Sequence, residues 1–211
     1  MNRGKYILIE GGDGSGKGTQ IQLLSQYLKE KNIPFIQTRE PGGTEISEIL
    51  RDIVLTKRKE ELTPQAELFS YLAARSQVIF HVVKPNLEKG AWVISDRGFP
   101  STIAYQGFGL GIDWEFISAA NEYALTHNEE YIYPDLVFII DVPVELGLEK
   151  ATKQGADRQE SRSIDFHRNV NLGYQHYLEN YSDSIRISYI EKGEITMHNQ
   201  IIKNLEKRFG I

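Results

Sequence analysis

The sequence predicts an α/β fold with a parallel β-sheet, and three observations support this prediction. Short apolar runs alternate along the chain with apolar residues at helical spacing, as they do where helices connect parallel strands. The runs Ala91–Ile94 and Leu136–Ile140 are continuously apolar, which is typical of strands buried on both faces. A glycine-rich turn at residues 11–18 joins the first apolar run to the first helical pattern.

Each element follows from these patterns in chain order. Strands are expected at Tyr6–Ile9, Pro34–Gln37, Ala91–Ser95, Leu136–Ile140 and Arg186–Ile190. A helix is expected after the glycine-rich turn, because Ile21, Leu24 and Leu28 repeat at helical spacing. Further helices are expected at about Ile46–Leu55, Pro64–Val83, Ile164–Glu179 and Ile195–Phe209. Thr63 can cap the helix that starts at Pro64, and Pro85 should end it.

Composition fits one domain spanning residues 1–211. The chain is 40% hydrophobic and 25% charged, without repeats or low-complexity stretches. Its net charge of −5 gives no general attraction to nucleic acid, so we expect no such partner and look for anion binding in local clusters. Without cysteine, the chain forms no disulfide and no thiolate zinc site. No apolar run approaches the roughly 20 residues of a membrane span, and the N-terminus lacks a secretory signal, so we expect no membrane partner and a cytoplasmic address.

The glycine-rich turn carries the clearest chemical signal. Its residues are Gly11, Gly12, Asp13, Gly14, Ser15, Gly16, Lys17 and Gly18, followed by Thr19. The glycines allow the backbone to fold around an anion, the following helix adds its positive end, and Lys17 supplies a mobile charge, so we expect nucleotide phosphates here. The alternative is a flexible turn, which would match this spacing by chance in about one chain in a few hundred. Position 18 of such a loop usually holds a residue whose hydroxyl binds Mg²⁺, but here it is Gly18. We therefore expect Mg²⁺ to be held by Thr19 or through water.

Charged residues follow three of the expected strands, at the sheet edge where ligands gather. Arg39, after the second strand, is either an anion contact or a solvated loop charge. An aspartate follows the third strand (Asp96) and the fourth (Asp141), and such an aspartate lies near Mg²⁺ or caps a helix. Only Asp96 has an adjacent guanidinium, that of Arg97, to bridge the phosphates of two substrates, so we assign the metal to Asp96.

The segment from about residue 150 to 162 is a candidate lid. Its hydrophobicity drops, and basic side chains gather around Gly155, namely Lys150, Lys153, Arg158 and Arg162. Such a segment either closes over a polyphosphate or remains a solvated charged loop.

The helix that starts at Pro64 contains two further candidates, Phe69 and Arg75. Taken alone, Phe69 would be assigned to the core. Arg75 lies about 120° around the helix from Phe69, so helix geometry does not by itself place them in one site.

Together these segments resemble thymidylate kinase of the bacterial type. The matching residues run in family order over nearly the whole chain: Gly12–Lys17, Thr38–Thr44, Phe69 with Ala73, Ala74 and Arg75, Asp96-Arg97 with Ser101-Thr102 and Ala104–Gln106, and Asp157-Arg158 with Asp165-Phe166 and Tyr174. The resemblance implies a P-loop NTPase three-layer sandwich with a five-stranded parallel sheet and a short lid. It also implies the reaction ATP + dTMP → ADP + dTDP with Mg²⁺, and a homodimer formed through helices near residues 64–83.

The resemblance further implies roles for individual residues. Residues 11–19 would bind ATP, and Asp13 would face both the 3′-hydroxyl region of dTMP and the metal-bound phosphates. Phe69 would stack on thymine, with Arg75 and Thr102 at the edge of the base. The remaining dTMP contacts would come from Arg39 and Arg97 at the phosphate, Tyr105 under the deoxyribose, and Ser101 and Gln106. The catalytic residues would be Asp13, Lys17, Arg97 and Arg158.

Two departures from the family pattern leave alternatives open. Gly18-Thr19 is similar to the loop of adenylate and UMP/CMP kinases, which makes a kinase of that type the nearest alternative. The loop has no arginine after Asp13, so a catalytic arginine should come from the lid, as Arg158 or Arg162. An alternative of another class is a P-loop nucleotide-binding switch, although the sequence contains no Asn-Lys-x-Asp guanine-binding string.

Overall fold

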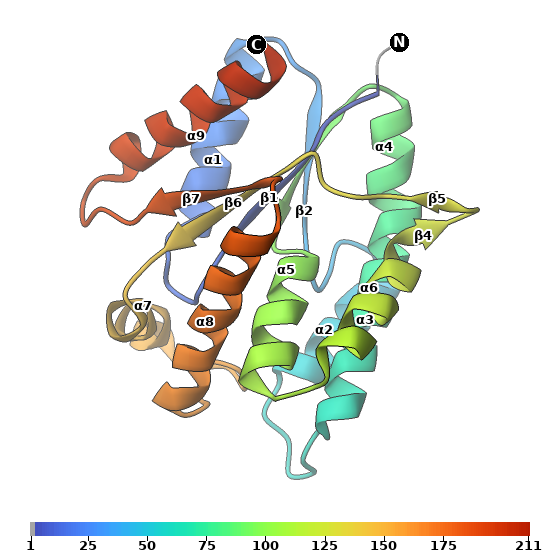
Figure 1. Ribbon diagram of the computed structural model, residues 1–211, viewed down its shortest axis with the longest axis vertical. Coiled ribbons are helices and arrows are strands. Elements are labelled where there is room, and N and C mark those ends of the chain that lie inside the picture. The colour runs from blue at the N-terminus through green and yellow to red at the C-terminus, as the bar shows by residue number, and fades with distance from the viewer. Residues whose placement is uncertain (1–2) are drawn as a thin grey trace.

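A five-stranded parallel sheet forms the centre of the protein (Figure 1). The computed structural model describes residues 3–211. The strand order is β2-β3-β1-β6-β7, and the strands are β1 Tyr6–Gly11, β2 Phe35–Arg39, β3 Trp92–Asp96, β6 Leu136–Asp141 and β7 Ser184–Ser188. This confirms the predicted fold class and all five expected strands, with shifts of up to two residues at their ends.

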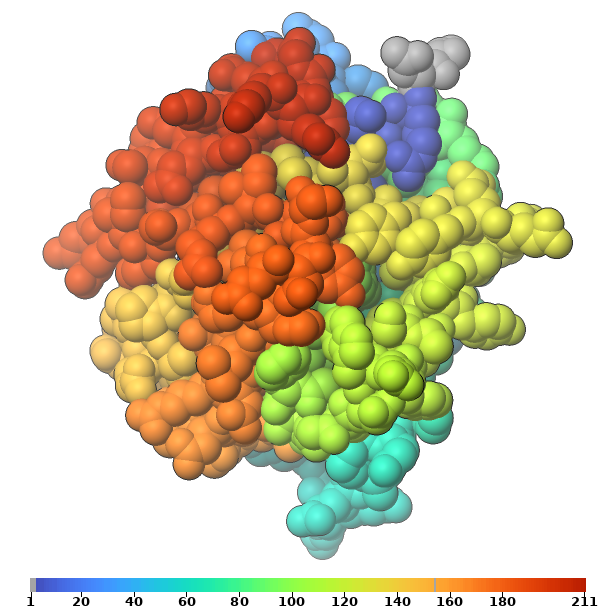
Figure 2. Space-filling model, viewed as in Figure 1, coloured from blue at the N-terminus to red at the C-terminus, as the bar shows by residue number. Residues whose placement is uncertain are grey.

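Helices cover both faces of the sheet and give three layers. Successive side chains of a strand point to opposite faces, so in β1 Ile7 and Ile9 pack on one side and Leu8 on the other. The first side is covered by α1 (Lys17–Glu30) and α9 (Glu194–Phe209). The second is covered by α3 (Pro64–Val78), α5 (Phe99–Thr102) and α8 (Ile164–Asn180). In Figure 2, α8 (orange) forms much of the visible surface on this second side.

The expected helix from Pro64 to Val83 is longer than predicted, and the prediction that Pro85 ends it is wrong. Thr63 caps α3 as expected, its side chain accepting from the N–H of Ala66 at 3.2 Å. A π-helical turn, Ile79–Val83, then leads into α4 (Lys84–Glu88). The wider turn restarts the hydrogen-bond ladder, so Pro85 falls in the first turn of α4, where a missing N–H is tolerated.

The remaining elements bring loops and helix starts to the carboxyl ends of the strands. α2 (Glu45–Leu55) follows β2, and a π-helical segment, Ile103–Gly109, continues α5. Besides α4 and α5, the elements not named from sequence are α6 (Trp114–Leu125), the β4–β5 hairpin (Thr126–His127 with Glu130–Tyr131), α7 (Val144–Ala151) and the 3₁₀ turn Thr152–Gln154.

The two ends of the described chain lie close together at the amino-terminal edge of the sheet (Figure 1). The ammonium group of Lys5 lies 5.1 Å from the centre of the Phe209 ring, near the end of α9. Among the helices of residues 3–211, we find none whose length and apolar character would suit a membrane span.

Candidate active site

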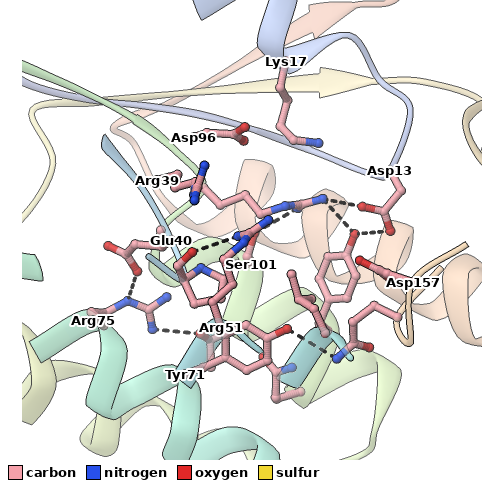
Figure 3. Close-up of a pocket in the computed structure, with 18 of the residues that line it drawn as sticks. Asp13, Lys17, Arg39, Glu40, Arg51, Tyr71, Arg75, Asp96, Ser101 and Asp157 are labelled. Atoms are coloured by element: carbon pink, nitrogen blue, oxygen red, sulfur yellow. Dashed lines mark hydrogen bonds and ion pairs between the residues drawn. The ribbon is translucent and has the colours of Figure 1, made fainter. Parts of the chain in front are cut away.

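A cavity of about 280 Å³ opens at the carboxyl ends of β1, β2 and β3 (Figure 3). Most of the residues assigned from sequence line it, although they come from six separate segments. These are Asp13, Gly14, Lys17, Arg39, Arg75, Asp96, Arg97, Ser101, Thr102, Tyr105 and Gln106. The cavity therefore opens at the sheet edge where the rule for parallel sheets places ligands.

The phosphate loop between β1 and α1 surrounds the ammonium group of Lys17. Lys17 Nζ donates to the carbonyl oxygens of Gly11 (3.1 Å) and Gly12 (2.9 Å). Burial, assisted by the nearby charge of Arg97, lowers the pKa of Lys17 to about 8. Gly14 has φ +68°, and a Cβ there would lie 2.0 Å from the carbonyl oxygen of Gly147 on α7, so only glycine fits.

Arg97 connects the phosphate loop to the cavity. Its Nη2 donates to Asp13 at 2.5 Å and to the Tyr105 hydroxyl at 3.2 Å, and its Nη1 donates to the Gly11 carbonyl at 3.1 Å. Its backbone has φ +73°, a left-handed conformation that costs energy for a residue with a side chain. Asp13 in turn accepts from the Tyr105 hydroxyl at 2.9 Å. Burial raises the pKa of Asp13, but Arg97 and Lys17 more than offset this, so the carboxylate stays ionised.

Glu10 holds the turn that carries Arg97, and no role was predicted for it from sequence. This fully buried carboxylate at the end of β1 accepts from the N–H of Gly98 (2.7 Å), the Ser101 hydroxyl (2.7 Å) and the Tyr174 hydroxyl (3.0 Å). Burial raises its pKa, which its donors only partly offset. A charged residue at a strand's carboxyl end was the signal that could have identified it.

The inner end of the cavity is built around Arg75, which is only 2% exposed. Its Nε donates to Glu40 at 2.7 Å, and its Nη1 donates to Thr102 at 2.8 Å and to Asn121 at 2.5 Å. The structure therefore brings Arg75 and Thr102 together, as expected. These bonds use Nε and Nη1 and leave Nη2 for a ligand. Neither Glu40 nor Asn121 was identified from sequence.

Phe69 requires a correction, because it does not line this cavity. Its side chain is 54% exposed and packs edge-on against Phe116 of α6, with ring centres 6.2 Å apart. Tyr71 lines the cavity instead. It precedes Arg75 by four residues and so shares its helix face, whereas Phe69 precedes it by six. Helical spacing was the available signal.

Two arginines stand at the mouth of the cavity. Arg39 pairs with Glu48 at 2.9 Å and stays about half exposed. Arg51 of α2 donates to the Pro41 carbonyl at 2.8 Å, and burial together with the charge of Arg39 lowers its pKa. Arg51 was not assigned to the site from sequence. With Lys17, Arg75 and Arg97, these side chains give the cavity five cationic groups, and five carboxylates also line it, namely Asp13, Glu40, Asp96, Asp157 and Glu160. Anion binding would therefore depend on where the cationic groups gather and not on the summed charge of the lining.

The segment 150–162 does not gather its basic groups over the phosphate loop, and Arg158 requires a second correction. Arg158 donates to the buried Glu67 of α3 at 2.5 Å and lines another cavity, of about 760 Å³. Arg162 also donates to Glu67, at 2.7 Å. The main cavity is instead bordered by Asp157, Gln159 and Glu160 of this segment.

The groups expected to hold Mg²⁺ fit that role in part. Asp96 has a buried Oδ1 that accepts no hydrogen bond from residues 3–211. Thr19 is exposed, and Gly18 offers no hydroxyl. Within the same residues, no group of three or more His, Asp or Glu side chains is arranged to hold a metal. An ion at this site would therefore be held mostly by ligands other than the protein, with Asp96 as the suitable carboxylate.

Comparison with known proteins agrees with this geometry. Residues 9–201 match the family model for thymidylate kinase. The chain is similar to the thymidylate kinase of Carboxydothermus hydrogenoformans (45% identity over 82% of this chain and 83% of that one) and of a Marinomonas species (39%, over 97% and 95%). Among solved structures, it resembles the thymidylate kinase of Ehrlichia chaffeensis, with a TM-score of 0.75, 32% identity, and coverage of 96% of this chain and 99% of that one.

Proposed function

The chain belongs to the thymidylate kinase family, and from this premise we propose that it transfers the γ-phosphoryl group of ATP to dTMP. The observation that carries the proposal is the position of Arg97. Its guanidinium hydrogen-bonds the phosphate loop at Gly11 and Asp13 while it lines the adjoining cavity. A donor phosphate on the loop and an acceptor phosphate in the cavity would therefore meet at one positive charge.

The phosphate chemistry needs positioning and charge neutralisation more than covalent help. Lys17 and the N–H groups of residues 11–19 would bind the ATP phosphates, Lys17 turning from the Gly11 and Gly12 carbonyls toward them. Arg39, Arg51 and Arg97 would hold the dTMP phosphate, because their guanidinium groups can pair with its oxygens. Mg²⁺, held by the nucleotide phosphates with Asp96, would supply further charge neutralisation.

The inner end of the cavity suits a pyrimidine. Arg75 Nη2 and the Thr102 hydroxyl can hydrogen-bond the edge of the base, and Tyr71 offers an aromatic ring in place of Phe69. Tyr105, fixed by Asp13 and Arg97, would lie against the deoxyribose, with Ser101 and Gln106 beside it. A wrong base would leave buried polar groups of this site without hydrogen bonds, so the site should reject it strongly. The loss of one methyl group, as in dUMP, costs only about 1–3 kcal/mol of binding, so dUMP should be rejected less strongly.

The direct test is an ADP-release assay with ATP, Mg²⁺ and one acceptor at a time: dTMP, dUMP, UMP, CMP, AMP or thymidine. We expect turnover with dTMP, weak turnover with dUMP, and almost none with AMP. Turnover with AMP or UMP equal to that with dTMP would assign the chain another acceptor. ATP hydrolysis without any acceptor would instead indicate a nucleotide-binding switch.

Arg97→Ala tests the role proposed for Arg97 between the phosphate loop and the cavity. We expect ATP binding to be retained and kcat to fall by about 10³-fold or more, because an arginine that neutralises the transition state contributes on this scale. Equilibrium ATP titration and steady-state kinetics would measure the two effects. A near-normal kcat would remove Arg97 from the mechanism.

We also propose that the protein is a cytoplasmic homodimer. Exposed aromatic side chains gather on α3 and α6, where Phe69 contacts Phe116 and Tyr123 is 86% exposed. The adjoining helix α2 exposes Ile46 and Ile49. Large apolar side chains at the surface are typical of protein interfaces, and we expect a second copy of the chain to cover them.

A further inference from the structure

Glu67 is a buried carboxylate of α3 that accepts hydrogen bonds from four side chains. Its side chain is 0% exposed. Oε1 accepts from Gln106 at 2.8 Å and from Gln159 at 2.7 Å, and Oε2 accepts from Arg158 at 2.5 Å and from Arg162 at 2.7 Å. Three of these donors belong to the segment 157–162, and the fourth belongs to the π-helical segment that follows α5.

The two arginines have further bonds that hold them where they are. The backbone N–H of Arg158 donates to the Leu55 carbonyl at 3.0 Å, and its Nε donates to the Val54 carbonyl at 2.7 Å, both at the end of α2. Arg162 Nε donates to the Gln159 side chain at 2.9 Å. Each guanidinium is therefore used on two sides, which leaves it poorly placed to reach a phosphate.

The same segment forms one wall of the main cavity. Asp157, Gln159 and Glu160 line that cavity, and Gln159 approaches the Tyr71 hydroxyl at 3.4 Å. Gln106, the other amide bonded to Glu67, lines it as well. A change in how Glu67 holds the segment would thus move groups that line the main cavity.

We propose that Glu67 is a positioning residue that fastens the segment 157–162 to α3 and so shapes the acceptor cavity. Arg158 and Arg162 act as its anchors and do not bind phosphate. A buried carboxylate with two guanidinium partners is costly to desolvate, and here it joins two segments that both line the main cavity. This inference rests on the proposed function, because it takes the main cavity to be the dTMP site.

Glu67→Gln tests the proposal, since glutamine has the same shape but turns an NH₂ group toward donor side chains. We expect the KM for dTMP to rise about tenfold or more, because hydrogen bonds to a charged group are lost, while the KM for ATP stays within about twofold. The matched control is Glu145→Gln on α7, which removes an exposed ion pair with Arg168 of α8 and should leave both constants unchanged. An equal rise in both KM values would overturn the proposal.

A double-mutant cycle with Arg158→Ala separates an anchor from a phosphate ligand. If Arg158 is an anchor, Arg158→Ala raises the KM for dTMP as Glu67→Gln does. The KM of the double variant is then only slightly higher than that of the more damaging single variant. If Arg158 binds the reacting phosphates, Arg158→Ala lowers kcat by about 10³-fold without changing the KM for dTMP. That second result would contradict the proposal.

Hydrogen–deuterium exchange provides a readout that does not depend on activity. In Glu67→Gln, amides of residues 155–163 should exchange faster while those of β1 and β3 do not change. If Glu67→Gln does not fold, Arg162→Ala, which leaves Glu67 paired with Arg158, should show a smaller effect in the same segment. Unchanged exchange would overturn the proposal, whereas a wild-type enzyme that makes no dTDP would count against the proposed function alone.

Discussion

Tyr71 and Phe69 stand two residues apart on α3, yet only Tyr71 faces the cavity. We expect Tyr71→Leu to raise the KM for dTMP about 10- to 100-fold, because stacking of a base on an aromatic ring contributes about 1–3 kcal/mol. Phe69→Leu is the matched control and should change that KM by less than about twofold, since its ring packs on Phe116. Steady-state kinetics with dTMP varied would measure both. The opposite ranking would return the base-stacking role to Phe69.

Lys17 should make the reaction sensitive to alkaline pH. Its depressed pKa means that the free enzyme loses this charge as pH rises through about 8, so kcat/KM for ATP should fall there. Bound phosphates stabilise the charged form, so kcat should fall only at higher pH. A pH profile of both parameters tests this, and a kcat/KM for ATP that stays level well above pH 8 would contradict it.

The same depressed pKa should make the folded protein more stable as pH rises, whereas it lowers kcat/KM for ATP. The unfolded chain keeps the Lys17 proton up to about pH 10.5, so burying the charged group opposes folding below about pH 8. Between these pH values the unfolded state binds more protons, and the contribution of Lys17 to the free energy of unfolding rises with pH.

Residues proposed to bind ligand directly were easier to predict than the residues proposed to position them. Lys17, Arg39 and Arg97 follow strand ends or a recognisable loop, so their place in the chain indicates their place in the fold. Glu10 and Glu67 act through partners far away in sequence, such as Tyr174 for Glu10 and Arg162 for Glu67. No local pattern encodes such pairs, because they depend on how helices pack across the sheet.

At the level of elements, the phosphate loop lies directly against α7. Gly14→Ala should lower the free energy of unfolding by about 2–4 kcal/mol, because it combines a left-handed backbone with a clash against the Gly147 carbonyl. The KM for ATP should rise as well. Gly18→Ala is the control, since an added Cβ there meets no atom within 4 Å, and it should be neutral or stabilising. Urea denaturation and ATP kinetics would measure these effects, and equal stability of the two variants would refute the argument.

Secondary structure was predictable where burial repeats regularly and not where it depends on tertiary contacts. The five strands of the sheet and the helices α1, α2, α3, α8 and α9 follow from apolar periodicity, whereas α4, α5, α6 and α7 were not named from sequence. The π-helical segments at Ile79–Val83 and Ile103–Gly109 do not follow from periodicity, since one extra residue per turn leaves no compositional trace. The second of these segments carries Tyr105 and Gln106, so an irregular element supplies part of the acceptor cavity.

At the level of the whole molecule, the exposed face of α3 and α6 predicts self-association. Light scattering with size-exclusion chromatography should give about twice the chain mass of 24.1 kDa. Replacing both Phe69 and Phe116 by serine should give the single-chain mass, because the apolar contact area is lost. Replacing Ile195, an exposed residue of α9 on the other side of the sheet, by serine is the control. A wild-type protein of single-chain mass would exclude the dimer.

The neighbouring ends of the described chain lie at the amino-terminal edge of the sheet (Figure 1). The cavity opens at the opposite edge, where β1, β2 and β3 end. A fluorescent fusion or a surface tether attached at either end would therefore point away from incoming nucleotides. An immobilised molecule would present its cavity to solution, which suits this protein to binding measurements on a sensor chip.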